Sequence, residues 1–183
     1  MELNFKPLTP ETWRDFSELF SDNGVCDDCW CMFWRVTRKE FNEGRKGGNR
    51  KAMKALVESG VVPGIMAYEN DKAVGWVSIA PRQDFASLER SPQLKRLDDQ
   101  PVWAIVCFYA AGTARGGMMA ALIEGAVDYA RSQGAHIVEA YPDISTEGSN
   151  STDLYMGSLS TFLKAGFKQV ADRGSQAVVR LDL

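Results

Sequence analysis

Hydrophobic and polar positions follow two different periods along the chain. Apolar side chains that alternate with polar ones predict strands, and apolar side chains three or four positions apart predict helices. Helices are expected over residues 10–20, 49–59, 119–133 and 153–166. Strands are expected over residues 3–9, 63–70, 72–81, 102–110, 136–142 and, as a pair around "DRG", within 168–183.

The order of these elements predicts the class of fold. From residue 63 onward it contains a strand–helix–strand–helix–strand core, which is typical of a partly parallel sheet covered by helices. We therefore expect one α/β domain spanning residues 1–183, with a mixed sheet and helices on both faces. Sheets of this kind usually bind ligands at the carboxyl ends of their strands.

Composition narrows the classes of function. The 183 residues are 45% hydrophobic and 25% charged, and the net charge of −3 comes without a basic stripe, so a nucleic acid partner is not expected. No apolar run approaches the roughly 20 residues of a membrane span, and the first residues do not resemble a signal peptide, so a cytoplasmic protein without a membrane partner is expected. The single histidine, His136, excludes mechanisms that need a histidine pair.

A glycine-rich turn, "GTARGG" over residues 112–117, separates a predicted strand from a predicted helix. It contains Gly116, Gly117 and Arg115 but no acidic residue. The first turn of a helix presents unpaired backbone N–H groups and a partial positive charge, which bind phosphate when the nearby side chains are small. The pattern fits a phosphate-binding turn, and it also fits an ordinary strand-to-helix turn.

This turn and the helix after it resemble motif A of the GNAT superfamily of acyl-CoA-dependent N-acyltransferases. In that family, a Gln/Arg-x-x-Gly-x-Gly/Ala loop holds the pyrophosphate of coenzyme A. Gly117 matches the first motif glycine, and "FLKAGF" resembles the family's Tyr-x-x-x-Gly-Phe ending, with Phe162 at the tyrosine position. The order of elements agrees over residues 4–183. Ala114 and Met119 depart from the outer positions of the motif.

The resemblance implies an N-acetyltransferase with a GNAT fold. Acetyl-CoA would be its co-substrate, and an amine of a small molecule or peptide would attack the thioester directly in a ternary complex. Backbone amides of the strand that ends near residue 109 would polarise the thioester carbonyl. Contacts with acetyl-CoA are expected from Cys107, Phe108, Tyr109, Arg115, Gly116, Gly117, Met118, Met119 and Phe162.

The catalytic acid and base are less obvious, because Phe162 has no proton to give to the departing thiolate. Tyr155 lies seven residues earlier and would share a face of the expected helix with Phe162. Tyr109 and Tyr141, at the ends of the two central strands, are further candidates for the acid. Glu139 is a candidate base.

The segment "CDDCWCMFWR" over residues 26–35 allows several interpretations. Its cysteine spacing suits zinc or a redox function, but a fourth zinc ligand is missing and no metal is expected. Its aromatic residues suit either a wall of the acceptor site, as a similar stretch in a bacterial GNAT subgroup suggests, or a structural plug. Acceptor contacts are expected from Trp30, Met32, Phe33, Trp34 and Tyr141.

Two interpretations of the whole protein remain beside the enzyme. The first is a non-catalytic acyl-CoA-binding or regulatory protein on the same fold, which the phenylalanine at residue 162 favours. The second is a cysteine-based redox or zinc protein. A homodimer is compatible with each of these functions.

Overall fold

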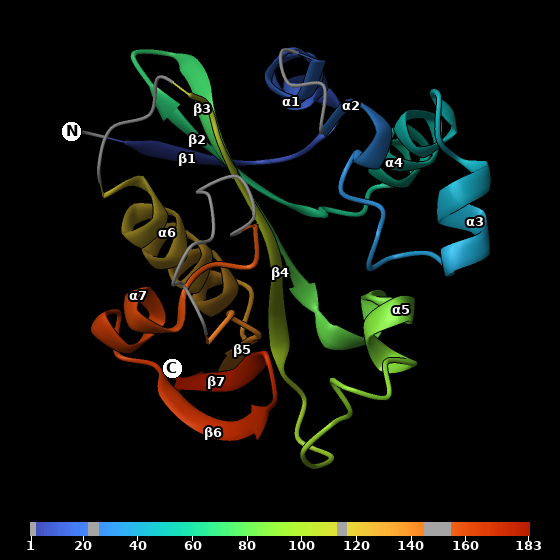
Figure 1. Ribbon diagram of the computed structural model, residues 1–183. Coiled ribbons are helices and arrows are strands. Elements are labelled where there is room, and N and C mark those ends of the chain that lie inside the picture. The colour runs from blue at the N-terminus through green and yellow to red at the C-terminus, as the bar shows by residue number, and fades with distance from the viewer. Residues whose placement is uncertain (1–2, 22–25, 113–116, 145–154) are drawn as a thin grey trace.

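Seven strands form one mixed sheet with helices on both faces (Figure 1). The computed structural model describes residues 3–21, 26–112, 117–144 and 155–183. The strands are β1 (Asn4–Pro7), β2 (Gly64–Glu69), β3 (Lys72–Pro81), β4 (Trp103–Ala110), β5 (Ile137–Ala140), β6 (Lys168–Arg173) and β7 (Gln176–Asp182). The helices are α1 (Trp13–Ser21), α2 (Cys26–Cys29), α3 (Arg38–Glu43), α4 (Gly48–Glu58), α5 (Ala86–Glu89), α6 (Met118–Ser132) and α7 (Leu159–Lys164).

The sheet order is β1-β2-β3-β4-β5-β7-β6, in which β4 and β5 run parallel and the other neighbours run antiparallel. The mixed, partly parallel sheet expected from the sequence is confirmed. Parallel pairing of β4 with β5 ends at Ile105, opposite Ala140, although β4 continues to Ala110. The last residues of β4 therefore leave their neighbour and open a gap in the sheet.

Two apolar layers hold the helices against the sheet. Helices α6 and α7 pack on one face through a cluster that includes Leu122, Ile123 and Phe162. On the other face, α1 and the chain that follows it pack through Phe16 and Trp30, while α5 covers the far end of the sheet (Figure 1). The described residues contain no helix that is both long and apolar enough to cross a membrane.

Two helices differ from the sequence-based expectation. The helix expected over residues 153–166 is wrong in its first half, because Gly157 adopts a φ of +81° and Ser158 caps α7 by accepting a hydrogen bond from the Thr161 amide. Helix α3 was not expected, although Thr37 and Glu40 form a capping box at its start. In both cases the local capping residues decide where the helix begins.

Candidate functional site

The gap between β4 and β5 begins at an irregularity in β4. Ser78 pairs with Cys107 and Ile79 with Ile105, so that Val106 is an extra residue, as in a β-bulge. Bulges end pairing and redirect side chains, and they are common beside active sites. Here the extra residue coincides with the end of the parallel pairing.

The backbone amide of Phe108 faces this gap. It donates a hydrogen bond of 2.6 Å to the carbonyl oxygen of Tyr155, and the Asp143 amide donates one of 3.1 Å to the carbonyl of Gly157. Residues 155–158 therefore lie between β4 and the chain that leaves β5. By the alternation of a strand, Ala110 presents its amide on the same side as Phe108.

The start of α6 lies beyond the end of β4. Gly117 caps the helix with a φ of +93°, a conformation that glycine adopts without the strain that a Cβ atom brings. Met118 is buried and Met119 is half-buried. Arg115 and Gly116, two expected pyrophosphate contacts, lie outside the described residues. The structure thus describes the N-terminus of a fifteen-residue helix, α6. The backbone N–H groups of such a terminus can bind phosphate.

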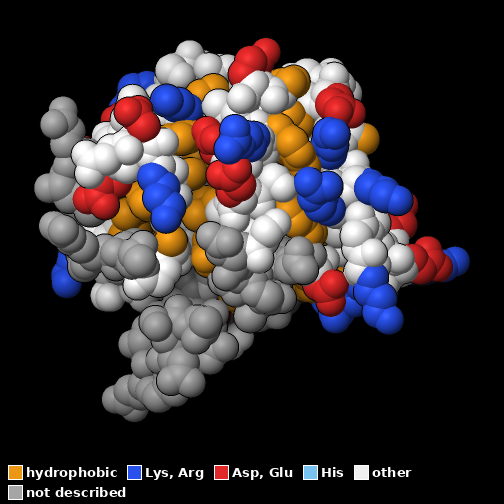
Figure 2. All heavy atoms as spheres, turned by 90° about the horizontal axis from the view of Figure 1, so that it is seen from above, with side chains coloured by type: hydrophobic (Ala, Val, Ile, Leu, Met, Phe, Trp, Pro, Cys, Tyr) orange, Lys and Arg blue, Asp and Glu red, His pale blue; other side chains and the backbone are white. Residues whose placement is uncertain are grey.

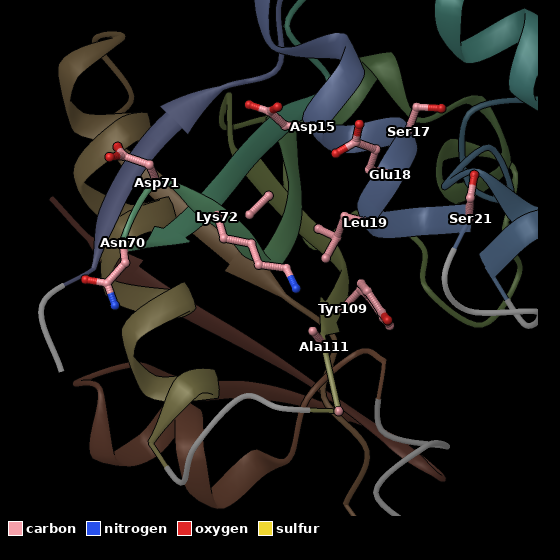
Figure 3. A pocket seen from close by; sticks show the side chains of 12 residues that line it. Asp15, Ser17, Glu18, Leu19, Ser21, Asn70, Asp71, Lys72, Tyr109 and Ala111 are labelled. Carbon is pink, nitrogen blue, oxygen red and sulfur yellow. The ribbon is translucent and has the colours of Figure 1, made fainter.

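A cavity of about 780 Å³ adjoins the end of β4 (Figure 3). Helix α1 borders one side with Asp15 and Glu18, and the β2–β3 turn borders another with Asp71 and Lys72. Tyr109 reaches the cavity from β4. Among the described residues that line it, three carboxylates against one ammonium group make the lining acidic, which favours a cationic ligand.

Two hydrogen-bonding groups hold the acidic residues of α1 in place. The Tyr68 hydroxyl donates to Asp15 at 2.8 Å, and burial together with this hydrogen bond raises the pKa of Tyr68. Arg14 pairs with Glu18 at 2.8 Å on the exposed side of the helix. Viewed from above, acidic, basic and hydrophobic side chains are interspersed over the described part of the surface (Figure 2).

Tyr109 and Tyr155, two of the three candidate acids, reach the end of β4 in different ways. Tyr109 lines the cavity, and its ring lies 5.7 Å from that of Phe20. Tyr155 does not share a helical face with Phe162, because α7 begins only at Leu159; that premise is wrong. Tyr155 nevertheless reaches the gap through its backbone carbonyl, and its side chain is 52% exposed.

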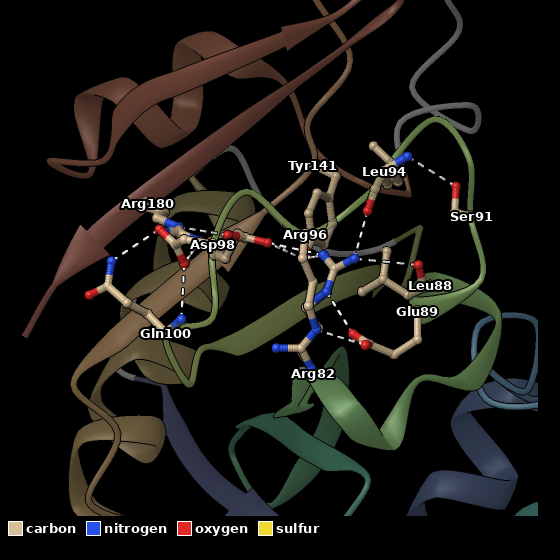
Figure 4. Close-up of polar contacts among 11 residues, drawn as sticks. Arg82, Leu88, Glu89, Ser91, Leu94, Arg96, Asp98, Gln100, Tyr141 and Arg180 are labelled. Carbon is tan, nitrogen blue, oxygen red and sulfur yellow. Dashed lines mark hydrogen bonds and ion pairs between the residues drawn. The ribbon is translucent and has the colours of Figure 1, made fainter.

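Glu139 and Tyr141 are buried in a polar network and not in an open site; Figure 4 labels Tyr141, Arg82 and Arg180 of this network. Arg82 donates to Glu139 at 3.1 Å and to the Tyr141 hydroxyl at 2.6 Å, while Arg180 donates to the other Glu139 oxygen at 2.6 Å. Tyr141 in turn donates to Glu139, and burial raises the pKa of Tyr141. Both oxygens of Glu139 are occupied, so its geometry gives no support to a role as general base.

Sequence reasoning missed Arg82, the centre of this network. Its guanidinium group is almost completely buried and also contacts Glu89 at 2.7 Å and the Leu94 carbonyl at 2.6 Å. Its only sequence signal was a basic residue directly after a strand, a pattern too common to identify a buried cation.

Phe162 lies in the core and not at an open surface. It is fully buried, with its ring 6.0 Å from Phe108 and 5.0 Å from Phe167. The expectation that Phe162 contacts the ligand is therefore unsupported by its position.

The aromatic segment after α2 divides into two parts. Trp30 and Met32 are 1% and 4% exposed, and Trp30 packs against Trp13 and Phe20. This burial does not favour the expected acceptor contacts of both residues, and it fits the structural plug. Phe33 and Trp34 are half-buried and keep some exposed surface. Within the described residues, no group of three or more potential ligands is arranged to hold a metal.

Comparison with solved structures shows the fold. The PaiA N-acetyltransferase from Thermoplasma acidophilum in complex with coenzyme A has a TM-score of 0.54 and 13% identity over 100% of both chains. A GNAT-family acetyltransferase from Listeria monocytogenes 4b F2365 has a TM-score of 0.58 and 10% identity, over 100% of this chain and 96% of that one. The ribosomal-protein-alanine N-acetyltransferase from Brucella melitensis has a TM-score of 0.53 and 16% identity, over 98% and 99%.

Sequence comparison identifies the family. No curated protein matches the chain. The family model described as the acetyltransferase (GNAT) family matches residues 25–157, which include β2, β3, β4, the glycine-rich turn, α6 and β5. With the splayed β4–β5 pair and the glycine-capped helix that follows β4, this match shows that the chain belongs to the GNAT acetyltransferase family.

Proposed function

We propose that this protein transfers the acetyl group of acetyl-CoA to an amine by direct attack in a ternary complex. One observation carries the proposal: the Phe108 amide faces the gap where β4 leaves β5, and the same strand leads to the glycine-capped start of α6. A thioester carbonyl in the gap would accept the hydrogen bond that Tyr155 now accepts. The pyrophosphate would lie at the amides of the first turn of α6.

Three steps follow for the groups of this chain. A hydrogen bond from the Phe108 amide stabilises negative charge on the thioester oxygen as the amine attacks. The amine attacks as its neutral form, so it first gives a proton to water or to a carboxylate. The thiolate leaves with or without a proton from a nearby hydroxyl, for which Tyr109 and Tyr155 are the candidates.

The acidic cavity supports a cationic acceptor. Asp15, Glu18 and Asp71 would raise the local concentration of a protonated amine beside Tyr109. The half-buried Phe33 and Trp34 offer apolar surface for another part of the acceptor. We therefore infer that the acceptor, a small molecule or a peptide, enters the cavity as a protonated, positively charged amine.

A second function has one specific observation in its favour. The fully buried Phe162 stands where the family motif usually has a tyrosine, and a phenyl ring cannot protonate a thiolate. The same fold could then bind acyl-CoA without turnover, as a regulatory protein would. Such a protein would bind acetyl-CoA but would not release free coenzyme A when amines are added.

A set of amines matched for size but different in charge tests the proposal. We expect amine-dependent release of coenzyme A thiol, with lower KM for cationic amines than for neutral ones. Asp71→Asn and Glu18→Gln should raise that KM and leave the Kd for acetyl-CoA unchanged. Asp128→Asn, at an exposed position of α6, is the control and should change neither the KM for the amine nor the Kd for acetyl-CoA. Acetyl-CoA binding without thiol release from any amine would instead support the regulatory protein.

A further inference from the structure

We propose that Cys31 and Cys107 form an oxidant-sensitive pair, which a hydroperoxide converts to a disulfide. This modification site is independent of the proposed acyl transfer. The two residues lie 76 positions apart in the sequence, and Cys31 comes from the turn after α2 while Cys107 comes from β4. Both belong to the apolar cluster on the α1 face of the sheet.

The backbone holds Cys31 in an unusual conformation. Trp30 and Cys31 have φ values of +45° and +57°, in a region that side chains other than glycine seldom occupy. Such conformations persist only where surrounding contacts enforce them, and they often accompany functional side chains. Here the enforcing contacts are the rings around Trp30 and the contacts of the Cys31 sulfur.

Strand β3 supplies the first contact of that sulfur. The Trp76 indole Nε1 donates a hydrogen bond to Cys31 Sγ at 3.1 Å. An indole N–H can only donate, so the sulfur is the acceptor and keeps its lone pair toward Trp76. Ser78, two residues further along the strand, pairs with Cys107 on β4. Trp76 and Ser78 point to the same face, which brings Cys107 beside the Trp76–Cys31 contact.

Cys107 makes the second contact. The neighbouring Cys107 thiol has the largest of the effects that lower the pKa of Cys31 against burial, followed by Trp76, Arg35 and Ser78. Cys107 Sγ donates a hydrogen bond of 3.8 Å to the Phe108 carbonyl. Cys31 is 6% exposed, whereas Cys107 is half-buried. Cys107 is therefore the more exposed of the two thiols.

Arg35 makes the surroundings of the pair positive. Its guanidinium group is 8% exposed, donates to the Pro63 carbonyl at 3.1 Å and lies 4.6 Å from the Phe85 ring centre, while its Nε is buried without a partner. Among the described residues, no carboxylate forms an ion pair with it. Burial lowers the pKa of Arg35 to about 10, and the nearby Cys31 and Asp84 act against this effect.

Cys29 provides an internal contrast. It lies two residues before Cys31, but burial and the neighbouring Cys31 charge raise the pKa of Cys29 to about 11. The thiolate is the reactive form of cysteine, so Cys29 should react far more slowly than Cys31 at neutral pH.

One hydroperoxide molecule is the oxidant for the formation of one disulfide. The Cys31 thiolate attacks a peroxide oxygen, the O–O bond breaks, and Cys31 becomes a sulfenic acid as hydroxide or alkoxide leaves. The Cys107 thiol then attacks the sulfenic sulfur, an S–S bond forms, and water leaves with the thiol proton. Two thiols lose two electrons in total, and the peroxide is reduced by two electrons.

Oxidation of the folded protein with hydrogen peroxide tests the proposal. We expect the intact mass to fall by two hydrogens, peptide mapping to find Cys31 joined to Cys107, and dithiothreitol to restore the mass. Cys31→Ser and Cys107→Ser should each lose the cross-link, and Cys29→Ser should keep it. Trp76→Phe, which removes the donor to the sulfur together with part of a buried ring, should slow its formation.

The wild-type protein alone can overturn the proposal, even if a variant fails to fold. If Cys31 and Cys107 both remain free thiols after peroxide treatment, as alkylation of the unfolded protein would reveal, the pair is not oxidant-sensitive. A cross-link that forms through Cys29 instead would overturn it as well. Neither result depends on whether the protein turns over acetyl-CoA.

Discussion

At the scale of single residues, burial decides what Glu139 does. Its carboxylate lies between Arg82 and Arg180 and is 2% exposed, and it shares the balance of their charges with Glu89 and Asp98. Breaking a buried ion pair from one side leaves an uncompensated charge and costs about 3–5 kcal/mol. We therefore expect Glu139→Gln to lower the free energy of unfolding by that amount, measured by urea denaturation.

Asp98→Asn is the matched control for this variant. Asp98 also pairs with Arg180, at 2.6 Å, but its side chain is 37% exposed and water can replace it. Its loss should destabilise the protein much less. If Glu139→Gln kept full stability and instead abolished turnover, Glu139 would be a catalytic base and not a structural anion.

Two hydroxyl groups remain as proton donors at the proposed site. A coenzyme A thiol resembles a cysteine thiol, with a pKa of about 8.5, and can leave as thiolate, so general acid help is worth only about 10²-fold. We expect Tyr109→Phe and Tyr155→Phe each to lower kcat by no more than this. Tyr129→Phe, on α6 beside Trp103, should leave kcat unchanged.

Steady-state rates with one good amine would measure these effects. A loss of several thousandfold in either Tyr109→Phe or Tyr155→Phe would show that a dedicated acid exists. In that case that tyrosine would replace the one that the family motif usually has at the position of Phe162.

At the scale of elements, α6 connects the turn to the sheet, and glycines flank both of its ends. Gly117 and Gly134 have φ values of +93° and +82°, and a Cβ atom would meet nothing within 4 Å at either position. Valine at either site should therefore cost a similar backbone strain, roughly 1–2 kcal/mol. Only Gly117 adjoins the amides that would bind pyrophosphate.

Calorimetry of acetyl-CoA binding separates strain from ligand contact. We expect Gly117→Val to weaken binding at least tenfold, about 1.4 kcal/mol, and Gly134→Val to leave it unchanged. Equal affinities in the two folded variants would mean that the start of α6 does not hold the ligand.

The elements also show which parts of the structure could be predicted from sequence. Apolar spacing predicted α6 and the central strand because burial repeats over many residues there. The start of α7 depended on Gly157 and Ser158 alone, and the longer apolar period around them obscured this signal. The glycine-rich turn alone also fits an ordinary strand-to-helix turn, and only the resemblance of the turn and the following helix to motif A favoured a binding role.

At the scale of the whole molecule, the site is assembled from segments far apart in the chain. The cavity takes side chains from α1, the β2–β3 turn and β4, and no local pattern links Asp15 to Asp71. The burial of Trp30 could not be predicted from the sequence either, because a run of aromatic residues indicates packing but does not indicate which residues it packs against. Only the fold brings these residues together or sets them apart.

The most direct test of the account follows the acetyl group itself. Acetyl-CoA labelled with carbon-13 at the carbonyl is mixed with the protein and a cationic amine, and the carbonyl resonance is observed by NMR. If the protein is an N-acetyltransferase, we expect an amide resonance to replace the thioester resonance, and only when both protein and amine are present. A thioester resonance that shows binding but persists with every amine would contradict it.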